Sequence, residues 1–373
     1  MSFVSKGAIL TGVKQPFVVQ NIVWDDPLDN EVVVNIKYCG CCHSDWHVHE
    51  GDYELTFPIL TGHEGVGVIE RVGKDVTQVK EGDHIVMSWM PTCGHCEWCI
   101  KGMGHLCDRG GNILEGPRPD GTFRAHLEDG TPVRQYGFLG AFCNKIVMPQ
   151  DGCIPVDKSV NMRDIPIIGC RIPTGFGAVI NVAKAKQGCT GMVVGLGGVG
   201  FNTIQGLVAS SATKIIAVDI VDNKEEWARQ FGATHYINSK RQNVVEEVMK
   251  ITYGRGVDYA FDCIGSAEVQ KICLQANAKD GTTVVSGVVP MNKPKTVEVD
   301  PFVLTHWQKK YMGNLYGGKG PFEQVPHLIE MYKAGRIKFA ELVTKEYELE
   351  QINEAYADML AGKNICGLIR LSE

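Results

Sequence analysis

The stretch Gly195-Leu196-Gly197-Gly198-Val199-Gly200 decides how the second half of this chain folds. It follows the apolar run 192–194 and precedes residues 201–209, which have the composition of a helix. Glycines at this spacing allow a tight turn and let backbone N–H groups approach a pyrophosphate at a helix N-terminus, where the dipole favours anions. The predicted cofactor-binding residues of this turn are Gly195, Gly197, Gly198, Val199 and Gly200.

An acidic residue follows the glycine turn at the distance expected of a dinucleotide-binding unit. The apolar segment 214–218 reads as a second strand and ends at Asp219, 24 residues beyond Gly195. A carboxylate there accepts from a ribose hydroxyl and repels a 2′-phosphate, so Asp219 favours NAD over its phosphorylated form.

The same alternation of helix and strand continues toward the C-terminus. The pattern predicts helices at 223–231, 244–252 and 267–276 and strands at 234–237, 257–261, 282–285 and 311–315. Strands alternating with helices indicate a doubly wound parallel sheet, with its ligand at the carboxyl edge of the strands. Two further helices are expected around 325–333 and 352–360.

Length and composition set the broad class. A chain of 373 residues predicts two domains, and 44% hydrophobic with 21% charged residues is typical of soluble globular proteins. A net charge of −6 gives no reason to expect nucleic acid or an anionic membrane as partner, and no apolar run reaches 18 residues. Fourteen cysteines behind an N-terminus without a signal-like apolar core favour reduced thiols, metal ligands and a cytoplasmic location.

The first part of the chain reads as short strands. Apolar runs at 8–10, 17–19 and 32–36 are separated by turn residues, which predicts a β-rich start. Residues 108–137 are rich in Gly, Pro, Asp and Arg, so a loop-rich insertion is expected there, with strands resuming at 141–148.

Four cysteines lie close together in the pattern C-x2-C-x2-C-x7-C. They are Cys93, Cys96, Cys99 and Cys107. Four thiolates so close in sequence can surround one tetrahedral zinc ion and leave no place for water. An iron–sulfur cluster uses similar spacing, but no proline follows the last cysteine and no second cluster motif occurs. The neighbouring His95 and His105 are expected to be solvated loop histidines.

A second set of metal-binding side chains is spread more widely. Cys42 opens the run Cys-His-Ser-Asp, and His63 and Glu64 stand between glycines in Gly62-His63-Glu64-Gly65. Thiolate, imidazole and carboxylate are groups that zinc prefers, and a catalytic site keeps one position open. The glycines suggest that His63 and Glu64 converge on one tight point.

With these motifs in this order, the chain from about residue 6 to its end resembles the zinc-dependent alcohol dehydrogenases of the medium-chain dehydrogenase/reductase superfamily. The resemblance implies an α/β protein with a GroES-like β-rich catalytic domain over 1–171 and 316–373 and a Rossmann NAD-binding domain over 172–315. It also implies two Zn²⁺ per chain and a homodimer, because the segment 108–137 is similar to that of the longer, dimeric members. The motifs Cys-His-Ser-Asp, Pro-Asp-Gly-Thr-Phe-Arg at 119–124 and Cys107-Asp108 look most like the nitrosodimethylaniline-linked bacterial subgroup.

The resemblance further assigns roles to single residues. The catalytic zinc ligands would be Cys42, His63 and Cys170, with Glu64 as the acid beside them, and the four-cysteine lobe would hold the structural zinc. Ser44 and His47 match the family's proton relay, and zinc would lower the pKa of an alcohol oxygen so that hydride can pass to nicotinamide. Besides the glycine turn and Asp219, the implied cofactor contacts are His43, Thr174, Lys224 and Val288. The implied walls of the substrate pocket are Trp89, Phe142, Val289 and Leu315, which would suit an apolar alcohol or aldehyde.

Two departures from the family pattern concern the cofactor. Many members carry arginine where His43 stands, and many carry arginine near the C-terminus where this chain has Asn364-Ile365-Cys366-Gly367. Without these fixed charges, we expect NAD to bind more loosely and with a stronger dependence on pH.

Three functions compete at this stage. The favoured one is a zinc- and NAD-dependent alcohol dehydrogenase acting on primary alcohols or aldehydes. A glutathione- or other thiol-linked formaldehyde dehydrogenase would need a basic entrance, for which Arg109, Arg118, Arg124 and Arg134 are available. A zinc protein without catalysis would be expected to lose catalytic ligands, yet Cys42, His63 and Cys170 are all present.

Overall fold

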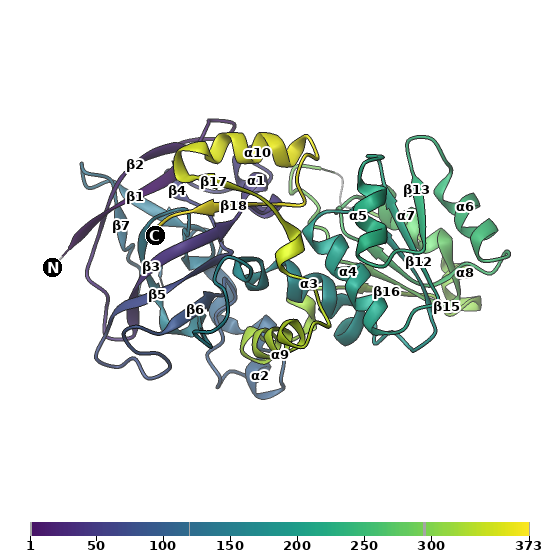
Figure 1. Cartoon of the computed structure of the whole chain (residues 1–373), viewed down its shortest axis with the longest axis horizontal. Coiled ribbons are helices and arrows are strands. Elements are labelled where there is room, and N and C mark those ends of the chain that lie inside the picture. Colours follow the sequence, from purple (N-terminus) through teal and green to yellow (C-terminus); the bar gives the residue numbers. More distant parts are fainter. Residues whose placement is uncertain (1, 119, 294–295, 373) are drawn as a thin grey trace. The chain divides into compact units, whose positions relative to one another are not determined.

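The computed structural model describes residues 2–118, 120–293 and 296–372. It divides the chain into two compact units, each built from segments far apart in sequence (Figure 1). The first unit comprises Met1–Cys170, Lys319–Ala334 and Phe339–Glu373. The second comprises Arg171–Gly318 and the short segment Gly335–Lys338.

The first unit is built on β-strands in two sheets. One is a closed barrel in the order β1-β2-β7-β8-β4; its strands are β1 (Phe3–Leu10), β2 (Val18–Trp24), β7 (Ala125–His126), β8 (Pro132–Gln135) and β4 (Ile59–Leu60). The other has the order β10-β6-β5-β3-β18-β17, with β9 also paired to β3. Its strands are β3 (Glu31–Gly40), β5 (Gly65–Val72), β6 (His84–Met87), β9 (Lys145–Pro149), β10 (Cys153–Val156), β17 (Val343–Glu348) and β18 (Cys366–Arg370).

The strand β3 lies at the centre of this second sheet. It pairs with β5 and β9 and, at its end, with β18, which brings the C-terminal strand beside the N-terminal half (Figure 1). Most of its residues are buried, and the core around it includes Trp24, Phe142 and Tyr356. Helices α1 (His43–Glu50), α2 (Glu97–Ile100), α9 (Pro321–Lys333) and α10 (Ile352–Leu360) complete the described part of the unit.

The second unit is a six-stranded parallel sheet in the order β13-β12-β11-β14-β15-β16. The strands are β11 (Thr190–Val194), β12 (Lys214–Asp219), β13 (His235–Asn238), β14 (Val257–Asp262), β15 (Asn277–Val285) and β16 (Lys310–Gly313). The helices are α3 (Arg171–Gly177), α4 (Gly198–Ala209), α5 (Lys224–Gln230), α6 (Val244–Ile251), α7 (Ala267–Ala276) and α8 (Pro301–His306). Strand order reverses between β11 and β14, the switch point at which such sheets bind ligands. The doubly wound sheet and the β-rich companion predicted from the sequence are therefore confirmed.

The prediction of a loop over 108–137 was wrong in part. This segment contributes β7 and β8, two of the barrel strands. Strands of two and four residues have too few positions to show an alternating pattern, so the Gly- and Pro-rich composition around them dominates the prediction. Residue 119, which opens the motif at 119–124, lies outside the described residues.

No helix in the described part of the chain has both the length and the apolar character needed to cross a membrane.

Candidate metal centre and cofactor turn

Four potential metal ligands converge inside the first unit. Cys42 precedes α1, His63 and Glu64 lie between β4 and β5, and Cys170 follows a short 3₁₀ turn at Pro166–Gly169. One ligand atom from each lies within 4.8 Å of the others, and all four residues are buried. Two thiolates, an imidazole and a carboxylate are a donor set that fits zinc. The structure thus brings together the residues that the sequence motifs single out.

Asp45 fixes the orientation of the histidine. Its Oδ1 accepts hydrogen bonds from the backbone N–H of Gly62 at 2.8 Å and from Nδ1 of His63 at 3.0 Å. With Nδ1 engaged, Nε2 of His63 is left to face a metal, as in the carboxylate–histidine–metal arrangement of known sites. Burial by itself lowers the pKa of His63, but Asp45 and Cys42 raise it well above its ordinary value.

The backbone at Gly62 explains part of the Gly-His-Glu-Gly motif. Its φ is +89°, and a Cβ there would meet the backbone nitrogen of Phe142 at 2.6 Å. Only glycine allows the chain to turn this closely beneath His63.

Aromatic rings pack around His63. The ring of Tyr136 lies 5.5 Å from it at 79°, and that of Trp89 lies 6.4 Å from it at 89°. Tyr136 is hydrogen-bonded to Tyr53, and burial raises the pKa of Tyr53 to about 12. Both tyrosines are neutral at pH 7 and give the site an apolar wall with a hydroxyl pair in it.

Of the two residues of this unit predicted to line the substrate pocket, Trp89 packs against His63 and Phe142 packs more deeply. Phe142 is fully buried and packs edge-on against Phe17 and Tyr356 at 6.2 Å each. Its ring packs in the core of the first unit, and its role as a pocket wall stays a prediction.

The predicted relay residues share one face of α1. Ser44 and His47 are three residues apart, which places them one turn apart on a helix. Oγ of Ser44 lies 3.7 Å from Sγ of Cys42, and Nδ1 of His47 lies 2.6 Å from Oδ2 of Asp52. The carboxylate of Asp52 thus fixes the orientation of the His47 ring through Nδ1. His43, at the start of the helix, is exposed, and its ring lies 5.1 Å from that of His47.

The four cysteines of the lobe form the other donor cluster found among the described residues. Their sulfur atoms lie within 4.8 Å of one another, with Cys93 to Cys99 and Cys96 to Cys107 each at 3.9 Å. A tetrahedral zinc with bonds of about 2.3 Å has sulfur–sulfur edges of about 3.8 Å, which fits this geometry. Backbone hydrogen bonds, that from Asp108 above all, lower the pKa of Cys96 to about 6, so this thiol ionises readily. His105 beside the lobe is buried, which corrects the expectation that it is solvated, while His95 is exposed as expected.

The glycine turn of the second unit has a distinct task at each position. Gly195 has φ of +93°, and a Cβ on Gly200 would lie 2.0 Å from the carbonyl oxygen of Gly195, so the first allows the turn and the last brings helix and strand together. A Cβ on Gly197 would meet nothing within 4 Å. The N-terminus of α4 has no side-chain cap, so its backbone N–H groups remain available to an anion.

Asp219 lies at the end of β12, next to this turn. Its Oδ2 accepts from the backbone N–H of Leu196 at 2.8 Å and from Nζ of Lys224 at 3.1 Å. The carboxylate therefore fixes the turn as well as presenting an acceptor beside it, a second task that the sequence reasoning did not foresee.

The other predicted cofactor and pocket residues of this unit lie in α3 and in the segments that follow β15 and β16. The carbonyl of Thr174 in α3 accepts from Nδ2 of Asn314, which follows β16. Val288 and Leu315 are about two-fifths exposed, at 43% and 42%, and Val289 is half-buried.

The arginines that a thiol-linked enzyme would need do not form an open basic entrance. Arg118 and Arg124 are buried beside Glu31, Arg109 pairs with Asp151, and Arg134 pairs with Glu115. These ion pairs weaken the argument for the thiol-linked alternative, and Arg109 is the one of the four whose side chain is more than two-fifths exposed.

Sequence reasoning did not foresee Asp45, Asp52, Tyr53 or Tyr136. Asp45 was visible in Cys-His-Ser-Asp, where an acid three residues after a metal ligand on a helix is the available signal. Nothing in the sequence pattern distinguishes the two tyrosines from ordinary core residues.

The fold and both metal centres define a class of protein, and comparison with known families agrees. Residues 28–158 match the alcohol dehydrogenase GroES-like domain, and residues 198–334 match the zinc-binding dehydrogenase domain. The chain belongs to the zinc-dependent alcohol dehydrogenase family and is an oxidoreductase.

Individual relatives span the full chain. It is 38% identical to an NDMA-dependent alcohol dehydrogenase of Amycolatopsis methanolica, with 98% of each chain covered. It is 35% identical to an S-(hydroxymethyl)glutathione dehydrogenase of Paracoccus denitrificans, with 98% of this chain and 99% of that one covered. The crystal structure of benzyl alcohol dehydrogenase from Acinetobacter calcoaceticus aligns with a TM-score of 0.93 at 30% identity, covering 99% of this chain and 100% of the other.

Proposed function

We propose that this protein interconverts a primary alcohol and its aldehyde with NAD(H), using one catalytic and one structural zinc per chain. The observation that carries the proposal is the convergence of Cys42, His63, Glu64 and Cys170 within 4.8 Å in a buried site. The alcohol dehydrogenases among its relatives support the same reaction.

Each residue around the proposed catalytic zinc site has its own role. Cys42, His63 and Cys170 would hold the catalytic zinc, with Glu64 beside them, and zinc would act as a Lewis acid that lowers the pKa of the alcohol oxygen. Asp45 holds the His63 ring in place through Nδ1. Ser44 and His47 carry the released proton outward, and Asp52 holds the imidazole in the tautomer that accepts it at Nε2. Trp89 and the Tyr53–Tyr136 pair keep the site apolar.

The second unit supplies the cofactor turn. The uncapped N-terminus of α4 and the open space at Gly197 suit a pyrophosphate, and the carboxylate of Asp219 suits a ribose diol. Lys224 lies beside that carboxylate and would contact the same ribose. Thr174, Val288 and His43 complete the proposed cofactor contacts, and Val289 and Leu315 the proposed pocket walls.

The substrate is proposed to be an apolar alcohol, with the nitrosodimethylaniline-linked enzymes as the nearest functional model. A thiol-linked formaldehyde dehydrogenase stays second, because some relatives are named S-(hydroxymethyl)glutathione dehydrogenase while the arginines here are buried or paired. Formaldehyde oxidation that appears only when a thiol is added would reverse this order.

The direct test combines metal analysis with one alanine variant. The purified protein is expected to hold two zincs per chain and to oxidise linear or aromatic primary alcohols with NAD. Cys42→Ala should hold one zinc, remain folded and lose turnover. A wild-type protein that holds both zincs and NAD but turns over no alcohol or aldehyde in a broad screen would contradict the proposal.

Two further expectations belong to the same proposal. The four residues of β16, at the edge of the second sheet, are all exposed and include Tyr311 and Met312, so this edge is available to pair with a second copy in a homodimer. All fourteen cysteines lie among the described residues and none of them forms a disulfide, which supports the reducing environment of the cytoplasm. Sedimentation of wild type and Met312→Lys would test the dimer.

A further inference from the structure

A cavity in the first unit has no part in the proposed reaction. It has a volume of about 240 Å³. Its lining combines the apolar side chains of Leu28, Pro91, Phe138 and Pro149 with three arginines and three acids: Arg109, Arg118, Arg124, Glu31, Asp120 and Asp151. Pockets for drug-sized ligands occupy about 300–1,000 Å³, so an occupant of this one would be small.

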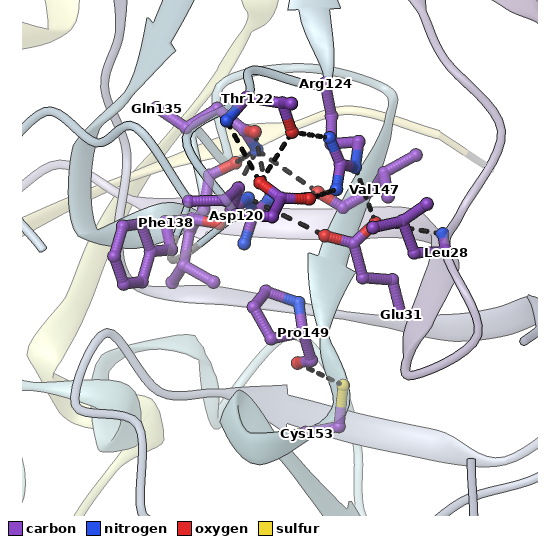
Figure 2. Close-up of polar contacts among 12 residues, drawn as sticks. Leu28, Glu31, Asp120, Thr122, Arg124, Gln135, Phe138, Val147, Pro149 and Cys153 are labelled. Carbon is purple, nitrogen blue, oxygen red and sulfur yellow. Dashed lines mark hydrogen bonds and ion pairs between the residues drawn. The ribbon is translucent and has the colours of Figure 1, made fainter. Parts of the chain in front are cut away.

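The charged groups of the cavity are unequally matched. Arg124 is bound twice, to Glu31 at 2.7 Å and to Asp120 at 2.6 Å, and Figure 2 shows these three side chains pointing toward one another. Arg109 pairs with Asp151. Arg118 makes a weaker ion pair with Glu31: its Nε lies 3.8 Å from Oε1 of the glutamate, whose other oxygen binds Arg124.

The guanidinium of Arg118 is left incomplete. Its Nη2 donates to Oε1 of Gln135 and to the carbonyl of Val147, both at 3.0 Å, while its Nη1 has no hydrogen-bond partner among the described residues. The side chain is only 4% exposed, and its guanidinium lies 5.4 Å from the centre of the Phe138 ring. A buried N–H of a charged group without an acceptor is costly, so an acceptor in the cavity would be strongly favoured.

The charged side chains of the cavity also differ in how deeply they are buried. Arg118, Arg124 and Glu31 are about 95% buried, so the floor carries two positive groups and one negative group. Asp120 and Arg109 are more exposed, at 39% and 42%, and stand nearer to solvent with Asp151. Burial lowers the pKa of Arg118 to about 10, as expected of a cation that lacks a full counter-charge.

We propose that this cavity binds a small carboxylic acid with an apolar body, whose carboxylate accepts from Nη1 of Arg118. The apolar part would lie between Phe138, Pro149 and Leu28, which Figure 2 shows around Asp120 and Glu31. Apolar walls disfavour a fully hydrated inorganic anion, and the small volume excludes a nucleotide. The site is separate in composition from the metal centre, since the two share no residue.

The test uses the zinc-loaded full-length protein and 3,3,3-trifluoropropionate, observed by ¹⁹F NMR. Saturable binding to one site per chain is expected, in addition to any binding at the catalytic centre. Arg118→Met should weaken that component at least tenfold, since it removes a charge-assisted hydrogen bond. Arg134→Met is the matched control: this arginine pairs with Glu115 outside the cavity, and its variant should bind like wild type.

A second variant guards against misfolding of Arg118→Met. Leu28 is 46% exposed at the cavity, so Leu28→Trp would fill the entrance while every contact of Arg118 stays in place. It should also weaken binding at least tenfold, and trifluoropropionamide should not compete for the Arg118-dependent component. Three results would each overturn the proposal. The first is no such component in wild type, and the second is binding in Arg118→Met and Leu28→Trp as tight as in wild type. The third is displacement of trifluoropropionate by equimolar sulfate.

Discussion

The sharpest prediction concerns Asp45, a residue whose fully buried carboxylate contacts the metal centre through His63. The change is Asp45→Asn, which keeps the shape of the side chain and an oxygen that can accept from the N–H of Gly62. What is lost is the negative charge facing Nδ1 of His63. Outer partners of metal-bound histidines affect metal affinity about 10–100-fold, so the variant should bind the catalytic zinc more weakly by about 1.4–2.7 kcal/mol.

The pH dependence of this loss follows from the same contact. Asp45 raises the pKa of His63, so below that raised pKa a proton competes with zinc for the ring in wild type. Asp45→Asn removes the charge that raises the pKa of His63, so the proton competes less with zinc in the variant. The ratio of wild-type to variant affinity, in which the titration of the cysteine ligands largely cancels, should therefore be greatest at high pH and should narrow as the pH falls.

The assay is competition between a chelator and the protein for the catalytic zinc between pH 6 and 9. The zinc in the cysteine lobe is the internal reference. Asp52→Asn is the control, because Asp52 holds His47 and not His63. It should leave zinc affinity unchanged. Equal zinc affinity of wild type and Asp45→Asn at pH 9, in protein that is shown to be folded, would refute the role given to Asp45.

Three more predictions address the other parts of the molecule. Cys96→Ala should remove one zinc per chain and lower the melting temperature by about 5 °C or more while alcohol turnover per folded molecule persists, as metal analysis and calorimetry would show. Gly200→Ala forces a Cβ to within 2.0 Å of the Gly195 carbonyl, so it should cost about 1–3 kcal/mol of stability and weaken NADH binding, whereas Gly197→Ala should keep full stability because its Cβ has open space. Desolvation, and then His47, lowers the pKa of His43, so wild-type affinity for NADH should rise only as the pH falls through that lowered pKa. His43→Arg should raise the affinity about twofold to fivefold at pH 7.5 and flatten the profile, and an identical profile in fluorescence titrations of both proteins would exclude a contact with the cofactor.

Much of the fold was predictable because its strongest signals are local. The glycine turn, the acid after the next strand and the alternation over 214–285 belong to a parallel sheet whose buried strands read as continuous apolar runs. The barrel was harder to predict, because β7 and β8 are held in place by pairing with distant strands rather than by their own composition.

In the candidate site, too, some residues have a local sequence signal and others depend on distant contacts. Cys42, His63 and Cys170 carry chemistry that a sequence pattern reveals, and the structure brings them together. The contacts of Phe142 with Phe17 and Tyr356 were not predictable, because an aromatic residue in a motif looks the same whether it faces a pocket or packs in the core. The incomplete pairing of Arg118 was not predictable at all, since it depends on how Arg124 takes up both nearby acids.

Cys170 is the last residue of its segment of the first unit, and the chain passes into the second unit at Arg171. A residue proposed as a metal ligand therefore stands directly at the boundary where a protein engineer would cut to exchange the cofactor-binding module. A chimera with a foreign nucleotide specificity has to join its parts after Cys170, and it has to take Gly335–Lys338 along with the transplanted module, because Gln205 bonds both the N–H and the carbonyl of Lys338. Grafts that cut before the cysteine would exchange the cofactor module and dismantle the Lewis-acid centre in the same step.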